Sequence, residues 1–219
     1  MEKPLDFKKE IRNLVKNKSY LLLSISFMSL DSICTAMSAV VASLTKPYNY
    51  SSLANAAFGG IFIIFGVIGS FILSIYLDKN PRYKFIMISI ALLAILSTAL
   101  SIFSLPSGNA ALFGSNVAVM GFSTIPMTPI AFAFAVELTY PTPEAMSNGM
   151  MILPNKLYGA LMGILSSYLC NQVDPRYAIA LFTINSCICA LSSFFLKEEL
   201  RRLRFKEDNS IASPISPDQ

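Results

Sequence analysis

The longest charge-free stretch of the chain, residues 85–136, constrains the fold most. It contains no Asp, Glu, Lys or Arg, and a short turn-forming segment at residues 105–109 divides it in two. A membrane-spanning helix needs about 20 apolar residues, so the stretch is long enough for two spans. The whole chain is 54% hydrophobic and 14% charged, whereas a soluble domain carries about 25% charged residues. The sequence therefore predicts an all-α integral membrane protein.

Further apolar runs on either side bring the expected number of transmembrane helices to six. We place the spans at 20–44, 52–77, 85–105, 110–136, 145–170 and 177–196. The basic segment 1–19 precedes them and is expected to form a short amphipathic helix. Residues 197–219 follow them, first basic and then rich in Ser and Pro, and we expect their end to be disordered.

The basic residues predict the orientation of these spans, because cytoplasmic loops carry an excess of Lys and Arg. With the N-terminus inside, the outside loops hold only Lys46 and Arg176. The inside segments hold Lys3, Lys8, Lys9, Arg12, Lys16, Lys18, Lys79, Arg82, Lys84, Lys197, Arg201, Arg202, Arg204 and Lys206. Both termini are therefore predicted to face the cytoplasm, and we expect the plasma membrane rather than an organelle.

The residue types exclude several classes of function. The chain has no histidine, which removes the usual general base and the commonest metal ligand. Its four cysteines lie in or beside apolar runs without zinc-site spacing. The basic residues flank membrane spans and no aromatic platform interleaves them, so the net charge of +4 reflects membrane flanks rather than nucleic-acid binding. We expect no enzyme, no cofactor and no metal site, and the bilayer as the main partner.

Two charged residues, Asp31 and Lys156, fall inside predicted spans. At 1.5 Å per residue, they lie about 16 and about 18 Å from the span ends, near the middle of a hydrocarbon core about 30 Å thick. Charges at that depth face a cavity or a partner. We predict that the two residues meet. The alternative is that Lys156 reaches solvent while Asp31 caps a local break in the backbone.

A polar hairpin between the fourth and fifth spans carries a family resemblance. The sequence Glu-Leu-Thr-Tyr-Pro, followed by an acidic residue, Ser-x-Gly and a later glycine, resembles the feline leukaemia virus subgroup C receptor family of the major facilitator superfamily. The matching residues are Glu137, Leu138, Thr139, Tyr140, Pro141, Glu144, Ser147, Gly149 and Gly159. The resemblance implies that the six spans are the C-terminal half of a twelve-helix transporter, built as two inverted three-helix repeats.

The resemblance also implies a small polar solute, because members of the family move choline and ethanolamine, and haem export has been ascribed to them. A Gln of the family's substrate site falls on Lys156, and a Tyr falls on Thr35. The substrate-cavity candidates are therefore Asp31, Thr35, Asn155 and Lys156. An ammonium at position 156 departs from the choline-handling members, since it would repel a quaternary ammonium.

Candidate gate residues flank the spans on the inside. Gly69, Asp78 and Lys79 match the superfamily's loop between its eighth and ninth helices, although close packing and a membrane anchor are the favoured explanation. A lone Glu137 at a helix C-terminus opposes the helix dipole, so we expect a basic residue to offset it, from Arg82, Lys84 or the tail. The complete gate set is Gly69, Asp78, Lys79, Glu137, Tyr140, Pro141 and Glu144.

Two functions stay open. The chain is either half of a transporter, completed by a second six-helix half or by a homodimer, or a truncated or partner-dependent six-helix protein without transport activity of its own. Gly159 and Gly163, four residues apart in the fifth span, are expected to allow close packing inside the bundle rather than to drive dimerisation.

Overall fold

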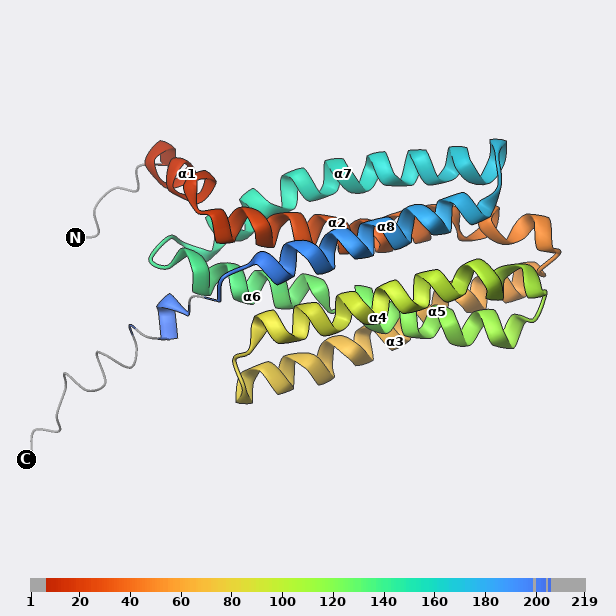
Figure 1. Ribbon diagram of the computed structural model, residues 1–219, viewed down its shortest axis with the longest axis horizontal. Helices are drawn as coiled ribbons and strands as arrows, with labels where there is room; N and C mark the ends of the chain where they lie inside the picture. The colour runs from red at the N-terminus through yellow and green to blue at the C-terminus, as the bar shows by residue number, and fades with distance from the viewer. Residues whose placement is uncertain (1–6, 199, 204, 206–219) are drawn as a thin grey trace, which may run out of the picture.

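A computed structural model describes residues 7–198, 200–203 and 205 of the chain (Figure 1). Over these residues the protein consists of eight α-helices and two short 3-10 helices, at Lys46–Tyr48 and Leu105–Ser107. The α-helices are α1 Phe7–Lys16, α2 Lys18–Thr45, α3 Ser52–Lys79, α4 Tyr83–Ser104, α5 Ala110–Thr124, α6 Met127–Thr139, α7 Glu144–Gln172 and α8 Pro175–Phe195. The expected disorder at the end of the tail concerns residues outside the described part, as do Lys3, Arg204 and Lys206.

Five segments of the described chain are long and apolar enough to cross a membrane: Lys18–Tyr48, Ser52–Lys79, Tyr83–Ser107, Ala110–Thr139 and Pro175–Phe195. The expected fifth span, α7, is not among them, although it is 29 residues long. Its hydropathy is lowered by polar residues on both sides of Pro154, among them Asn148, Asn155, Lys156 and Asn171. The all-α membrane fold is confirmed, and the role of α7 depends on what its polar residues face.

The expected fourth span is a broken helix, which differs from the continuous 110–136 segment that the sequence predicted. The break separates α5 from α6 at Ile125 and Pro126. Proline has no backbone N–H and its ring clashes with the preceding turn, and a second proline, Pro129, follows in the first turn of α6. The apolar character of the stretch does not indicate the break, whereas its two prolines do.

The long helices run side by side along the molecule (Figure 1). Helix α2 packs against α7, α8 and α6; α3 packs against α5; and α4 packs against α8 and α5. Close approach of α3 and α5 depends on Gly121, because a Cβ there would collide with the backbone carbonyl of Phe62. The interior is filled by side chains such as Phe27, Phe134 and Phe182, all nearly inaccessible.

Helix α1, the α6–α7 connection and the segment after α8 lie at the same end of the bundle (Figure 1). Asn17, between α1 and α2, joins the start of α2 to α6. Its side chain accepts a hydrogen bond from Tyr20 N at 3.2 Å and thereby caps α2, and it donates to Leu138 O of α6 at 3.2 Å. The expected short helix before the first span is therefore present, and it is held against the bundle.

Candidate functional site

Asp31 lies near the middle of α2, and its side chain is only 11% exposed. A charged side chain at the centre of a membrane costs about 2.5–3.5 kcal/mol on the scales derived from membrane insertion. Such a group needs hydrogen-bond donors or an opposite charge. The surroundings of Asp31 supply both.

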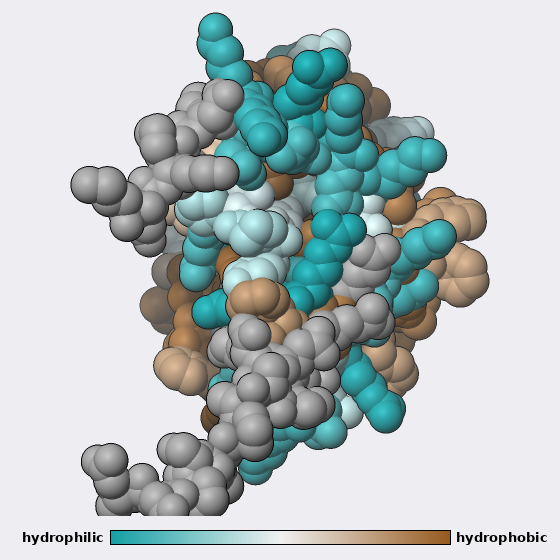
Figure 2. Space-filling view, turned by 90° about the vertical axis from the view of Figure 1, so that its left-hand side faces the viewer, coloured by the Kyte–Doolittle hydropathy of each residue, from teal (hydrophilic) through white to brown (hydrophobic). Residues whose placement is uncertain are grey.

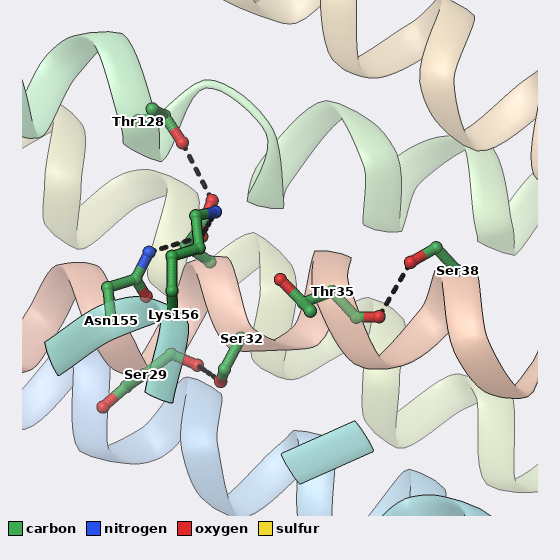
Figure 3. Close-up of polar contacts among 8 residues, drawn as sticks. Ser29, Ser32, Thr35, Ser38, Thr128, Asn155 and Lys156 are labelled. Carbon is green, nitrogen blue, oxygen red and sulfur yellow. Dashed lines mark hydrogen bonds and ion pairs between the residues drawn. The ribbon is translucent and has the colours of Figure 1, made fainter. Parts of the chain in front are cut away.

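Three donors from two other helices converge on the Asp31 carboxylate (Figure 3). Thr128 Oγ1 donates to Oδ1 at 2.9 Å, and Asn155 Nδ2 donates to Oδ2 at 2.7 Å. Lys156 Nζ lies 3.5 Å from Oδ2. The predicted contact between Asp31 and Lys156 is therefore present, and the alternative in which Asp31 only caps a backbone break is not what the structure contains.

The break between α5 and α6 positions Thr128. Because the chain restarts as a helix at Met127, Thr128 lies in the first turn of α6. The hydrogen bond from Thr128 connects this helix end to the Asp31 carboxylate. The broken helix thus contributes a hydroxyl donor to a buried anion.

Asn155 and Lys156 are neighbours on α7 but point in different directions. Asn155 is 1% exposed, whereas the side chain of Lys156 is 63% exposed. Asn155 thus points into the packed interior, and Lys156 lies on an open face of the bundle with its ammonium turned back to Asp31. Asn155 Oδ1 is buried and accepts no hydrogen bond from any described residue. The site therefore borders accessible space and keeps one unused acceptor.

Thr35 lies one turn along α2 from Asp31, on the same side of the helix, and Ser38 follows in the next turn (Figure 3). Helix α7 approaches α2 closely here, because a Cβ on Gly159 would lie 3.3 Å from the Thr35 side chain. A Cβ on Gly163 would meet Ala39 at 3.9 Å, an ordinary contact. These two glycines serve packing between α2 and α7, as the sequence predicted.

A small apolar hollow of about 270 Å³ opens next to Ser38, between α2 and α3. Cys34, Met37 and Ser38 line it from α2, and Phe58 and Phe62 line it from α3. It places an apolar surface within a few turns of the Asp31 site. Sequence reasoning did not identify this hollow, because its two walls come from separate spans.

The structure thus brings the four predicted cavity residues together, whereas the predicted gate residues lie in several separate places. Gly69 packs against α5, since a Cβ there would lie 2.9 Å from Phe122 O. Asp78 and Lys79 are exposed at the end of α3, and Asp78 makes no hydrogen bond or ion pair with any described residue. This geometry supports the packing interpretation of Gly69 and gives Asp78 no hydrogen-bonded or ion-paired partner within the described chain.

Glu137 and Tyr140 contact the segment that follows α8. Glu137 is 7% exposed, and its Oε2 accepts a hydrogen bond from the backbone N–H of Leu203 at 3.1 Å. The ring of Tyr140, which precedes the cis-bonded Pro141, lies 5.1 Å from the ring of Phe205. Of the three expected partners for Glu137, the tail is the one that makes the contact, through its backbone rather than a basic side chain.

The remaining gate candidate, Glu144, is the exposed first residue of α7. A carboxylate at that position interacts favourably with the helix dipole. The residue that sequence reasoning missed is Thr128. Its signal was its place between Pro126 and Pro129, where a broken helix turns a hydroxyl into the bundle.

Comparisons with known proteins agree with this architecture. Residues 21–217 match the model of the Major Facilitator Superfamily. The chain is 26% identical over 199 residues to the choline/ethanolamine transporter flvcr2a of Danio rerio, covering 90% of this chain and 42% of that protein. It is 25% identical over 197 residues to the choline/ethanolamine transporter FLVCR1 of Felis catus, with 90% and 35% covered.

A third relative is solute carrier family 49 member A3 of Danio rerio, 26% identical over 219 residues, with 93% of this chain and 46% of that protein covered. The chain thus spans less than half the length of these curated relatives. The match to the superfamily model extends over most of the chain. The chain therefore belongs to the Major Facilitator Superfamily, a family of membrane transporters and not of enzymes.

Proposed function

We propose that this chain is the C-terminal six-helix half of a transporter for a small polar solute, and that Asp31, Thr35, Asn155 and Lys156 line its path. One observation carries the proposal. A buried carboxylate in the middle of a span is held by donors from two other helices, and its Lys partner lies on an open face. Ionisable groups at membrane depth characterise solute and ion pathways.

The pattern of helix packing supports two related three-helix units. In the first unit, α2, α3 and α4 correspond in order to α5/α6, α7 and α8 of the second. The contact between α2 and α7 then corresponds to the contact between α5 and α3, and the contact between α2 and α8 corresponds to the one between α5 and α4. All four contacts are present. Inverted repeats of three helices build each half of a major facilitator transporter.

Helix α7 has an apolar face and a neighbouring face of small or polar residues, and this division supports a sixth span. The apolar face is exposed and suits lipid: Leu153, Leu157, Leu161, Ile164 and Tyr168. The neighbouring face lowers the hydropathy of the helix and carries Lys156 and Ala160, which are exposed, and Gly163 and Ser167, which are half-buried. A helix that lines a water-filled path has this division. Under the positive-inside rule, the α1 end then faces the cytoplasm, and we propose the plasma membrane as its location.

Lys156 bears on the class of solute. Two like charges 5 Å apart at an effective dielectric of 20 repel by about 3 kcal/mol, so the ammonium disfavours a simple cation. With Asp31 beside it, the site offers both signs of charge. We propose a neutral or zwitterionic solute, in contrast to the choline and ethanolamine named for the relatives.

Cysteine accessibility tests the path. In a variant whose own cysteines, Cys34, Cys170, Cys187 and Cys189, are replaced by Ser, Ala160→Cys and Leu161→Cys place a thiol on each face of α7, one turn from Lys156. In membranes of cells that express the gene's full product, a charged, water-soluble thiol reagent should modify position 160 and not position 161. Equal reactivity at the two positions would refute a water-lined face.

Transport tests the solute class. The protein is reconstituted in liposomes, and the uptake of labelled choline is compared with that of labelled betaine. Betaine adds a carboxylate to the same quaternary ammonium. Betaine should be favoured, and Lys156→Gln should shift the preference toward choline by about tenfold or more, because the repulsion of about 3 kcal/mol is removed. Saturable uptake of neither solute, with or without a second half, would favour the non-transporting, partner-dependent alternative.

A further inference from the structure

A hollow of about 770 Å³ lies at the α1 end of the bundle, far from Asp31. It is bordered by α1, the start of α2, the α6–α7 connection and the segment after α8. Its charged lining residues are Lys9, Glu10, Lys16, Lys18, Lys197 and Arg201. Its volume falls within the range of about 300–1,000 Å³ for small-molecule sites, and neither the proposed path nor the gate residues account for its charge.

Specific contacts hold the walls of the hollow in place. Thr142 Oγ1 donates to Glu10 Oε2 at 2.7 Å, which ties α1 to the α6–α7 connection. Leu14 on α1 is 2% exposed, and Asn17 binds the carbonyl of Leu138. The carboxylate of Glu10 is thus used in fixing α1. The hollow is part of the folded structure and not a gap beside a loose helix.

The cations of the hollow exceed its carboxylates. Lys16, Lys18 and Lys197 are exposed, and none of them forms an ion pair with any described residue. Lys9 and Arg201 each have an interaction of their own, so the positive charge assigned to the hollow is that of the three lysines. Figure 2 shows this end of the molecule, where hydrophilic side chains cover the face and apolar ones lie at its flanks. Three lysines that line the same hollow in this way attract an anion.

The hollow also extends to the ends of two candidate membrane spans. Leu22 in the first turns of α2 and Phe195 at the end of α8 line its inner side, and Phe195 is 67% exposed. Both helices are candidate membrane spans. Apolar and cationic linings therefore meet at the depth where hydrocarbon gives way to headgroups. A free anion in water would make no use of the apolar part.

We propose that this hollow binds an anionic phospholipid, with its phosphate-bearing headgroup among Lys16, Lys18 and Lys197 and an acyl chain along Leu22 and Phe195. Basic pockets between transmembrane helices bind such headgroups, and the cytoplasmic leaflet carries them. The bound lipid would link α1, α2 and the segment after α8. The inference depends on the membrane placement of α2 and α8, not on the identity of the transported solute.

Lipid binding to the purified full chain tests this proposal. The probes are dioctanoyl phosphatidylserine, dioctanoyl phosphatidylinositol phosphate, dioctanoyl phosphatidylcholine and inorganic phosphate, and the readout is the affinity from native mass spectrometry and from thermal stabilisation. The test variant is Lys16→Gln/Lys18→Gln/Lys197→Gln. The matched control, Lys8→Gln/Arg12→Gln/Arg82→Gln, removes the same charge from exposed residues outside the hollow.

The wild-type chain should bind the anionic lipids more tightly than phosphatidylcholine. The test variant should lose about 100-fold in affinity, at about fivefold for each lysine, while the control keeps most of it and both retain their helical circular dichroism. Equal losses in both variants would overturn the proposal in favour of diffuse surface attraction. Inorganic phosphate that binds as tightly as the lipids would overturn it in favour of a free-anion site, and no preference for anionic lipid would refute it.

Discussion

The ammonium of Lys156 lies 3.5 Å from a carboxylate oxygen of Asp31, yet the two side chains differ widely in exposure, 63% against 11%. One partner is fixed in the interior by hydrogen bonds from Thr128 and Asn155, while the other reaches it from an open face. Ion pairs with an exposed partner contribute little stability by themselves. The importance of this pair is that it neutralises a charge that cannot leave the membrane interior.

The first prediction is a double-mutant cycle on this pair. Lys156→Gln leaves the buried carboxylate without its counter-charge and should lower folded yield more than Asp31→Asn does, because the amide introduced at position 31 can donate to the unused acceptor of Asn155. The double variant should recover part of the loss. The measurement is the yield of monodisperse protein or its thermal unfolding in detergent. Strictly additive losses would mean that the two residues do not interact.

Much of this site followed from the sequence. Asp31 and Lys156 were conspicuous because charges inside apolar spans are costly, and their depth along two helices follows directly from the helical rise. Thr128 was hidden because its role arises from a break in a helix. Periodicity and hydropathy treat residues 110–136 as one apolar segment, and only the steric effect of Pro126 on the backbone separates α5 from α6.

The features at the α1 end could not be predicted in the same way. The bond from Leu203 N–H to Glu137 joins residues far apart in the chain, and the basic hollow assembles side chains from four separate segments. The sequence indicated that Glu137 needed compensation but did not distinguish Arg82, Lys84 and the tail. Such pairings depend on how helices pack, which local patterns do not encode.

The second prediction concerns the hydroxyl of Thr128. Thr128→Val keeps the shape of the side chain but removes a donor to a buried carboxylate, a bond to a charged group worth about 1.5–3 kcal/mol. We expect a lower unfolding temperature in detergent and weaker solute binding. The control is Thr183→Val, whose hydroxyl bonds only to Ile179 O of its own helix. If the two variants are equally stable, the bond from Thr128 to Asp31 contributes nothing measurable.

The third prediction concerns close packing of α3 and α5. Gly121→Ala would place a methyl group on the backbone of Phe62, which must then move, so overpacking should cost at least about 1–3 kcal/mol. Gly114→Ala on the same helix is the control, since its nearest contact would be a side-chain atom of Phe58 at 3.4 Å. Unfolding in detergent should separate the two variants clearly. A Gly121→Ala protein as stable as Gly114→Ala would contradict the packing described here.

The last prediction concerns the anchoring of the segment after α8. Glu137 is buried and accepts the N–H of Leu203, and a carboxylate acceptor makes a stronger bond than a neutral amide. Glu137→Gln should therefore weaken the attachment and expose the peptide bonds after Arg201 and Arg202 to trypsin, with faster cleavage at those sites. Glu144→Gln, which removes a charge from an exposed helix start, should leave the cleavage rate unchanged.

Because the same segment supplies Lys197 and Arg201 to the basic hollow, anionic lipid should slow the cleavage in the wild-type chain and slow it less in Glu137→Gln. Unaltered cleavage in Glu137→Gln would show that the segment is held by other contacts, such as the one between Tyr140 and Phe205.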